Sequence, residues 1–301
     1  MGTTIELVLW GVDSSLADVV VTELRERADR WERIFSRFRP DSELCRVNHH
    51  RGAWVSTSSP FVSVLRVAIE GHSTTEGRFD PTLLDALERL GYDRSFEELH
   101  SRGGARFEAD ARPPFSDREL WEIEIDQDRG AVRLPTGLRV DLGGVAKGAF
   151  VDSVDDLVGE MPGAIVDAGG DLRAWGTPGA EDTWRVGVQH PGQLSLDIAN
   201  LLLPAGESVA IATSSTRSRT WFADGSRQNH LLDPRDGRAV AWSTPSVTTV
   251  AATVAAAEIE AKSILVALAR GERMPDTTAC FVLVAHENGS YETVNPHATV
   301  A

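Results

Sequence analysis

The chain has 301 residues, of which 42% are hydrophobic and 25% charged, so it can bury one large core or two smaller ones. Its 45 Asp and Glu outnumber its 30 Lys and Arg, and the net charge of −15 argues against a nucleic-acid-binding surface. No stretch approaches the roughly 20 apolar residues of a membrane span, and the N-terminal residues lack the features of a signal peptide.

The first third of the sequence predicts helices. Residues 5–10 alternate as a strand, and apolar residues at helical spacing from Leu16 to Phe35 then predict a long amphipathic helix. We expect further helices over about 60–71 and from Asp80 to Gly91, the latter with Asp80 as N-cap. Residues 100–115 are rich in Gly, Pro and basic residues, which predicts a variable loop or insertion within a single domain covering 1–301.

Strand patterns dominate the rest of the chain. They cover about 121–125, 131–134, 164–167, 184–189, 194–203, 209–213, 227–232 and 281–284, with one more helix at 255–269. Because helices and strands do not alternate strictly, we predict an α+β fold in layers, with a mixed or antiparallel sheet core and flanking helices.

The run RVDLGGVAKGAFVD, residues 139–152, is typical of an anion-holding junction. Val140 and Leu142 alternate like a strand, two glycines allow close approach of a ligand, and the helix that follows carries Lys147. The run matches neither the Walker A loop nor G-x-G-x-x-G. A purely structural turn therefore stays open at this point.

Other segments also place charged or hydroxyl residues beside Gly or Pro at the edge of an apolar element. They are SRFRPDSELCRVN (36–48), GRFDPT (77–82), DAGGD (167–171), ATSSTRSRTW (212–221) and NHLLDPRDGR (229–238). Each has a structural explanation when taken alone: a solvated helix end, an N-cap, a turn, or a half-buried strand histidine.

Taken together and in this order, the segments resemble the ApbE-like FAD:protein FMN transferases. Members of that family carry S-R-F-x-x-x-S-x-L-x-x-x-N, G-x-F-D-P-T, D-L-G-G-x-A-K-G, G-G-D, T-S and H-x-x-D-P-x-T-G. The matching stretches of this chain extend from about residue 36 to residue 268. Several ordered matches to motifs of low degeneracy make chance a poor explanation.

The resemblance implies a reaction in which FAD is cleaved at its pyrophosphate. FMN is esterified to a Thr or Ser of an acceptor protein, and AMP is released. Such a transfer needs a base for the hydroxyl proton, and His230, the histidine of the H-x-x-D-P motif, is the candidate.

The resemblance also implies the residues of the FAD site. We expect Phe38, Arg78, Phe79, Asp80, Asp141, Lys147 and the backbone at Leu231 to line it. A second wall would come from the turn Gly169, Gly170 and Asp171.

Magnesium is the second cofactor that the resemblance implies, and here the chain departs from the family. Family members bind it through the Asp and Thr of A-D-x-x-A-T and a backbone carbonyl that corresponds to Gly144. This chain has Glu258 and Lys262 at the Asp and Thr positions, and a protonated lysine has no lone pair for a metal. We expect Lys262 to replace the metal in part, with Glu258 holding it; a shifted magnesium ion and a plain i,i+4 surface pair are the alternatives.

Two other functions fit the same pocket: an FAD-binding protein that transfers nothing, and an FAD pyrophosphohydrolase in which water replaces the acceptor hydroxyl. The acceptor motif D-G-x-[ST]-G-A-[ST] does not occur in this chain, so we expect a separate acceptor protein. Cys45 and Cys280 have no C-x-x-C spacing, which together with the N-terminal residues predicts a cytoplasmic location. The oligomeric state is not indicated.

Overall fold

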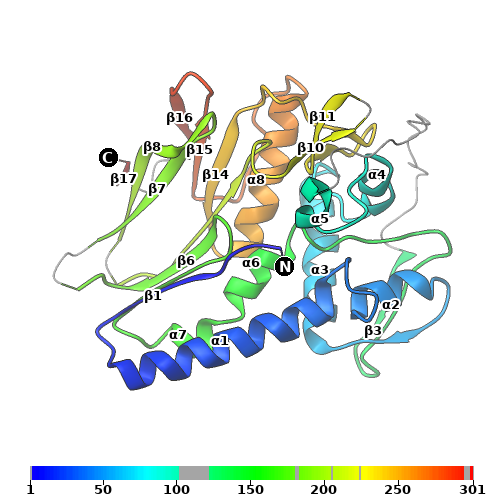
Figure 1. Ribbon diagram of the computed structural model, residues 1–301, viewed down its shortest axis with the longest axis horizontal. Coiled ribbons are helices and arrows are strands. Elements are labelled where there is room, and N and C mark those ends of the chain that lie inside the picture. Colours follow the sequence, from blue (N-terminus) through cyan, green and yellow to red (C-terminus); the bar gives the residue numbers. More distant parts are fainter. Residues whose placement is uncertain are drawn as a thin grey trace. The chain divides into compact units, whose positions relative to one another are not determined.

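The computed structural model describes residues 2–101, 122–179, 183–204, 206–223, 225–294 and 299–300. Most of the expected variable segment 100–115 lies outside these ranges. The chain divides into two compact units (Figure 1). The first unit comprises 1–2, 30–146 and 216–242, and the second comprises 3–29, 147–215 and 243–301. Two of the boundaries between the units fall inside helices, namely α1 (Ser14–Phe35) and α6 (Ala146–Asp152).

The first unit is built from helices, a small sheet and two hairpins. Its helices are α2 (Glu43–His49), α3 (Ser59–Thr74), α4 (Leu84–Arg89) and α5 (Phe96–Ser101). Its sheet has the order β2 (Val55–Ser56), β4 (Ala131–Arg133), β3 (Glu124–Asp126). The hairpins pair β10 (Thr220–Ala223) with β11 (Ser226–Asn229), and β12 (Leu232–Asp233) with β13 (Arg238–Ala239). One core of this unit contains Ala86, Leu87, Tyr92, Trp221, Ala223 and Leu232.

The second unit is built around a seven-stranded sheet. In spatial order its strands are β1 (Glu6–Trp10), β5 (Gly163–Asp167), β6 (Asp171–Gly176), β9 (Val209–Ser214), β14 (Ser246–Ala251), β15 (Phe281–Ala285) and β16 (Tyr291–Val294). All neighbouring strands in it are antiparallel. A second sheet has the order β17 (Thr299–Val300), β8 (Gln193–Leu203), β7 (Trp184–His190). Helices α7 (Asp155–Val158) and α8 (Val254–Ala269) lie wholly within this unit, which also contains most of α1 and α6.

The alternation of side chains along the central strands produces three layers. Thr249 of β14 donates its hydroxyl hydrogen to the Ala257 carbonyl of α8 at 2.7 Å, which places α8 on that face of the sheet. The next residue, Val250, belongs instead to the core shared with β7 and β8. Successive side chains of a strand point to opposite faces, so one strand packs against a helix and a second sheet at once. The fold is α+β, as predicted, and its main sheet is antiparallel.

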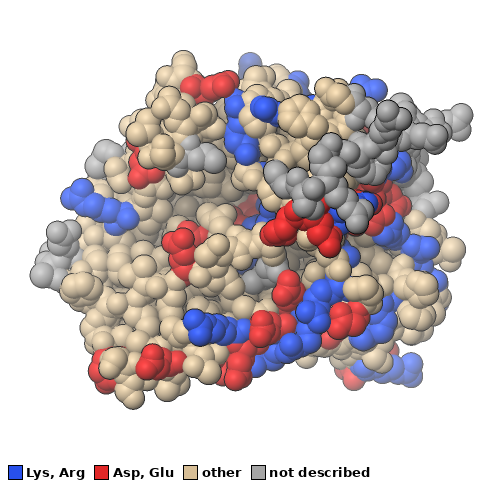
Figure 2. Space-filling model, in the orientation of Figure 1, with Lys and Arg blue, Asp and Glu red and all other residues tan. Residues whose placement is uncertain are grey.

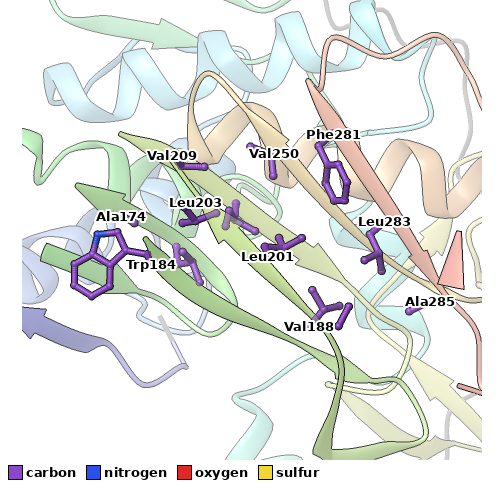
Figure 3. Close-up of a cluster of buried hydrophobic side chains, with 13 residues drawn as sticks. Ala174, Trp184, Val188, Leu201, Leu203, Val209, Val250, Phe281, Leu283 and Ala285 are labelled. Carbon is purple, nitrogen blue, oxygen red and sulfur yellow. The ribbon is translucent and has the colours of Figure 1, made fainter. Parts of the chain in front are cut away.

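The core between the two sheets is drawn in Figure 3. Phe281 and Leu283 project from β15, while Val188 and Leu201 come from β7 and β8. Burial of each large apolar side chain contributes about 1.5–3 kcal/mol relative to exposure. This core packs against the main sheet, whose strands β6 and β9 contain motif residues.

The molecular surface carries charges of both signs. On the face drawn in Figure 2, basic and acidic side chains lie next to one another rather than in separate zones. Within the described ranges, no helix is both long enough and apolar enough to cross a membrane.

The N-terminus of α8 is held by two side chains. Asp152, the last residue of α6, accepts the backbone N–H groups of Val254 and Ala255 through its two oxygens, both at 2.9 Å. Thr253 is the N-cap and accepts from Ala256 N at 3.1 Å. Burial raises the pKa of Asp152 even though these N–H groups favour its ionised form. The end of the 139–152 run is therefore a cap that holds α8.

Replacing Asp152 tests this cap. Asp152→Ala leaves two N–H groups of α8 without their acceptor, and we expect it to lower the free energy of unfolding by about 1–3 kcal/mol. Urea unfolding followed by tryptophan fluorescence measures the change. Glu160→Ala, at an exposed position close by in the sequence, is the control and should change it by less than about 0.5 kcal/mol. Equal effects of the two variants would refute the capping role.

Candidate active site

A buried asparagine connects the first motif to the 139–152 run. Asn48 of α2 donates its amide to Val140 O at 2.8 Å and accepts Val140 N–H at 2.9 Å. These bonds use both backbone groups of Val140, and Asp141 N donates to Pro81 O at 2.7 Å. The predicted strand at Val140 to Leu142 is therefore wrong: the segment is anchored by a side chain and a loop instead of a neighbouring strand.

Arg37 and Asp141 form a partly buried ion pair in the first unit. Arg37 Nε lies 3.3 Å from Asp141 Oδ2, and Arg37 Nη1 donates to Tyr92 O at 2.7 Å. The guanidinium lies over the rings of Phe38 and Tyr92, at 4.4 and 4.2 Å from their centroids. In the described part of the chain its buried Nη2 has no hydrogen-bond partner. Asp141 also accepts Gly143 N–H at 2.8 Å, so it shapes the glycine turn.

The GRFDPT segment forms a turn, and Asp80 organises it. Asp80 Oδ1 accepts both the backbone N–H of Thr82 at 2.8 Å and its hydroxyl at 2.7 Å. The prediction that Asp80 caps a helix is wrong, because this local Asx turn takes its carboxylate and α4 begins only at Leu84. Phe79 is buried, and Arg78 Nη1 donates to Thr75 O at 3.0 Å.

His230 lies at a break between two short strands. The predicted continuous strand over 227–232 is wrong, because the side chain of Asn229 interrupts it. Asn229 accepts Leu231 N–H at 3.0 Å and donates to Val240 O at 2.8 Å. The carbonyl of Leu231 in turn accepts Val240 N–H at 2.8 Å. The half-buried His230 is thus fixed at its backbone by its neighbours on both sides.

The turn between β5 and β6 contains the other predicted glycines. Gly169 and Gly170 have φ values of 75° and 91°, which favour glycine. Gly170 N donates to Asp167 Oδ1 at 2.7 Å, and a Cβ on Gly169 would lie 2.2 Å from Thr3 Oγ1. The turn delivers Asp171 as the first residue of β6, where it is buried.

Four ionisable side chains of the second unit form one buried group, which we call the charge cluster: Lys147, Asp171, Glu258 and Lys262. Lys147 Nζ lies 2.6 Å from Asp171 Oδ2 and also pairs with Glu258 Oε1. Lys262 Nζ lies 3.0 Å from the same Glu258 oxygen. Glu258 Oε2 accepts the backbone N–H of Gly148 at 3.0 Å. The structure thus brings together three predicted residues that are far apart in the sequence, and joins Lys262 to them.

A close approach of α6 and α8 makes these contacts possible. A Cβ on Gly148 would lie 2.7 Å from the backbone N of Ala255 and from the carbonyl carbon of Val254. Only glycine fits there, and its buried backbone N–H then donates to Glu258. The last glycine of D-L-G-G-x-A-K-G is explained by helix packing.

The cluster moves the pKa values of its two carboxyl groups in opposite directions. Burial would raise the pKa of Glu258, but the positive charges of Lys147 and Lys262 hold it well below its usual range. Burial and the charge of Glu258 raise the pKa of Asp171 above its usual range, against the opposing effect of Lys147 and Lys262. Burial also lowers the pKa of Lys262. Of the two carboxyl groups, Glu258 is therefore the one that the cluster holds more firmly in its ionised form.

The side chains at 258 and 262 do not fit a magnesium site. Both oxygens of Glu258 already accept hydrogen bonds, and the ammonium of Lys262 has no lone pair to donate. Across the described ranges, no three or more His, Cys, Asp or Glu side chains are grouped so that they could hold a metal ion. Gly144 lies in the turn before α6, and its role as a metal ligand stays a prediction.

Three side chains with structural importance at these motifs had no role in the sequence-based prediction: Asn48, Arg37 and Asn229. Asn48 and Arg37 belong to the first motif, and Asn229 precedes His230. An asparagine or arginine in a motif at the edge of an apolar element is the available signal, because buried polar groups need partners.

Comparison with known proteins places this architecture in a defined class. A solved ApbE protein from Thermotoga maritima superposes with a TM-score of 0.78 at 25% identity, covering 97% of this chain and 93% of its own. The flavin transferase ApbE from Vibrio cholerae has the same fold, with a TM-score of 0.69 at 24% identity, over 98% of this chain and 94% of its own.

Sequence relatives agree. The FAD:protein FMN transferase of Salmonella typhimurium is 26% identical over 86% of this chain and 74% of its own length. That of Klebsiella pneumoniae is 28% identical over 83% and 75%. The profile of the ApbE family matches residues 1–279. The chain belongs to the ApbE family.

The Asn48 contacts predict a stability effect. Asn48→Ala leaves the buried N–H and C=O of Val140 without partners, and we expect a loss of about 2–5 kcal/mol in the free energy of unfolding. Urea unfolding measures it. Asn288→Ala is the matched control, because Asn288 accepts hydrogen bonds only within an exposed turn. A loss at Asn48 no larger than that at Asn288 would contradict the anchoring role.

Proposed function

We propose that this chain is an FAD:protein FMN transferase. The observation that carries the proposal is the match to the ApbE family over residues 1–279, together with relatives named FAD:protein FMN transferase. The enzyme transfers FMN from FAD to an acceptor protein.

In the proposed reaction, a Thr or Ser hydroxyl of the acceptor attacks the phosphorus atom of the FMN half of FAD. The new P–O bond forms as the bond to the AMP oxygen breaks, and AMP leaves. The hydroxyl proton passes to His230, since a neutral hydroxyl is a poor nucleophile until its proton is removed. Asn229 supports this role because it fixes the backbone of Leu231, the next residue after His230.

The FAD-binding residues belong to the same proposal. They are Phe38, Arg78, Phe79, Asp80, Asp141, Lys147, Gly169, Gly170, Asp171 and Leu231. We add Arg37, because its buried Nη2 has a hydrogen to donate and its plane lies over Phe38. An acceptor atom of FAD would satisfy this donor, which otherwise costs about 1–3 kcal/mol.

Two alternatives would use the same proposed FAD-binding residues: a protein that binds FAD without transfer, and an FAD pyrophosphohydrolase. They differ in products. With FAD alone, the hydrolase forms AMP and FMN and the binder forms neither. With an acceptor domain, only the transferase leaves covalent fluorescent flavin on the acceptor, and incubation followed by denaturing electrophoresis and nucleotide chromatography separates the three.

His230 provides the sharpest test of mechanism. His230→Ala removes the proposed base, and we expect the rate of flavin transfer to fall by about 10²- to 10⁴-fold. The rate is measured as covalent flavin fluorescence on the acceptor. His286→Ala is the control: this histidine lies after β15, and its described partner is Glu292 at 3.2 Å. Unchanged transfer by the His230 variant would refute its role as base.

The location of the modification is also a proposal. Both cysteines are free thiols, which is consistent with a reducing compartment and with modification of an acceptor in the cytoplasm. Fractionation of cells that produce the chain, followed by immunodetection, tests the compartment.

A further inference from the structure

The charges of the cluster cancel without a metal ion. Lys147 and Lys262 supply two positive charges, and Asp171 and Glu258 supply two negative ones. The Glu258 side chain is 1% exposed and each lysine side chain is 15% exposed, so solvent screens these charges poorly. A divalent ion beside Glu258 would add two positive charges to a buried group that is already neutral, and both ammonium groups would repel it.

The geometry of Glu258 leads to the same conclusion. Its Oε1 accepts from Lys147 and Lys262, and its Oε2 accepts from Gly148 N–H. Magnesium requires oxygen ligands in near-octahedral geometry. To bind here it would have to displace an ammonium that is already paired with this carboxylate.

The sequence uses lysine only at the two cationic positions of the charge cluster. Of 30 Lys and Arg residues, only Lys147 and Lys262 are lysine; the others are all arginine. An ammonium is a compact point charge, whereas a guanidinium is a wide planar fork. Two such groups share one buried carboxylate oxygen here, which calls for compact cations.

We propose that the ammonium of Lys262 takes the place of the divalent cation, so that this chain binds FAD and transfers FMN without a metal. The inference rests on the proposed function. It assigns Lys262 the positive charge that magnesium would supply in the site implied by the family. Glu258 orients that ammonium from one helical turn away.

The first experiment uses the unmodified chain and does not depend on activity. Because the sequence has two lysines, carbon-13 labelling of lysine at Cε gives two side-chain NMR signals, assigned with a Lys262→Arg variant. Paramagnetic Mn²⁺ broadens signals from nuclei close to it. We expect millimolar MnCl₂ to leave both signals sharp, with and without FAD, and selective broadening reversed by excess MgCl₂ would overturn the inference.

The second experiment creates the donor that the chain lacks. Lys262→Thr removes one positive charge and supplies a hydroxyl oxygen, and we expect this variant to acquire Mg²⁺ binding in isothermal titration. Its FAD affinity should then rise by about tenfold or more with MgCl₂, an ordinary coupling between two ligands. Arg270→Thr, at the end of the same helix, loses the same charge outside the cluster and should acquire nothing.

The outcomes separate this inference from the proposed function. FAD binding and FMN transfer by the unmodified chain in EDTA, unchanged by MgCl₂, support both. FMN transfer that occurs only with MgCl₂ overturns the proposal that Lys262 replaces the metal, but it supports the proposed transferase function. FAD binding in EDTA with no transfer in either EDTA or MgCl₂ overturns the transferase, and sharp lysine signals in MnCl₂ then still support the role of the Lys262 ammonium. If the Lys262→Thr variant does not fold, the lysine NMR signals of the unmodified chain in MnCl₂ still test the inference.

Discussion

The carboxylate of Glu258 is the constraint on which the second unit depends. It lies inside the protein in the second turn of α8, and a buried charge is stable only when it is paired and hydrogen-bonded. Lys147, Lys262 and the N–H of Gly148 meet this demand. The need to bring the Gly148 N–H within reach explains why α6 and α8 touch backbone to backbone, and why Asp152 then caps α8.

The sequence predicted the layers of the fold because periodicity reports on burial. Four strands of the main sheet, β1, β5, β9 and β15, and the three long helices α1, α3 and α8 lie close to their predicted positions, whereas strands β6, β14 and β16 were not predicted. Three further errors lie where a side chain forms the hydrogen bonds that a neighbouring strand or helix was expected to form. Asn48 anchors Val140, Asp80 closes its own turn, and Asn229 breaks a strand before His230. Such contacts join residues far apart in the sequence or depend on one side-chain rotamer. The hydrophobic periodicity of the sequence therefore does not predict them.

Motif order named the candidate residues, whose roles toward FAD stay predictions, but it gave few of the contacts between them. The charges at 147, 171 and 258 could be named from the sequence, but their mutual neutralisation depends on the antiparallel sheet that places β6 beside β9 and α8 across them. Arg37 was hidden inside a motif, because its ion pair with Asp141 crosses about one hundred residues of chain.

The commitment of both lysines to one buried cluster also determines how the protein meets reagents in the laboratory. Amine-reactive dyes, crosslinkers and formaldehyde attack exposed uncharged amines, and the chain's two lysines lie largely inside the protein. Side-chain labelling at lysine should therefore be slow while the fold is intact, and its onset would report the opening of the second unit. The same property makes the chain suited to coupling through an added tag.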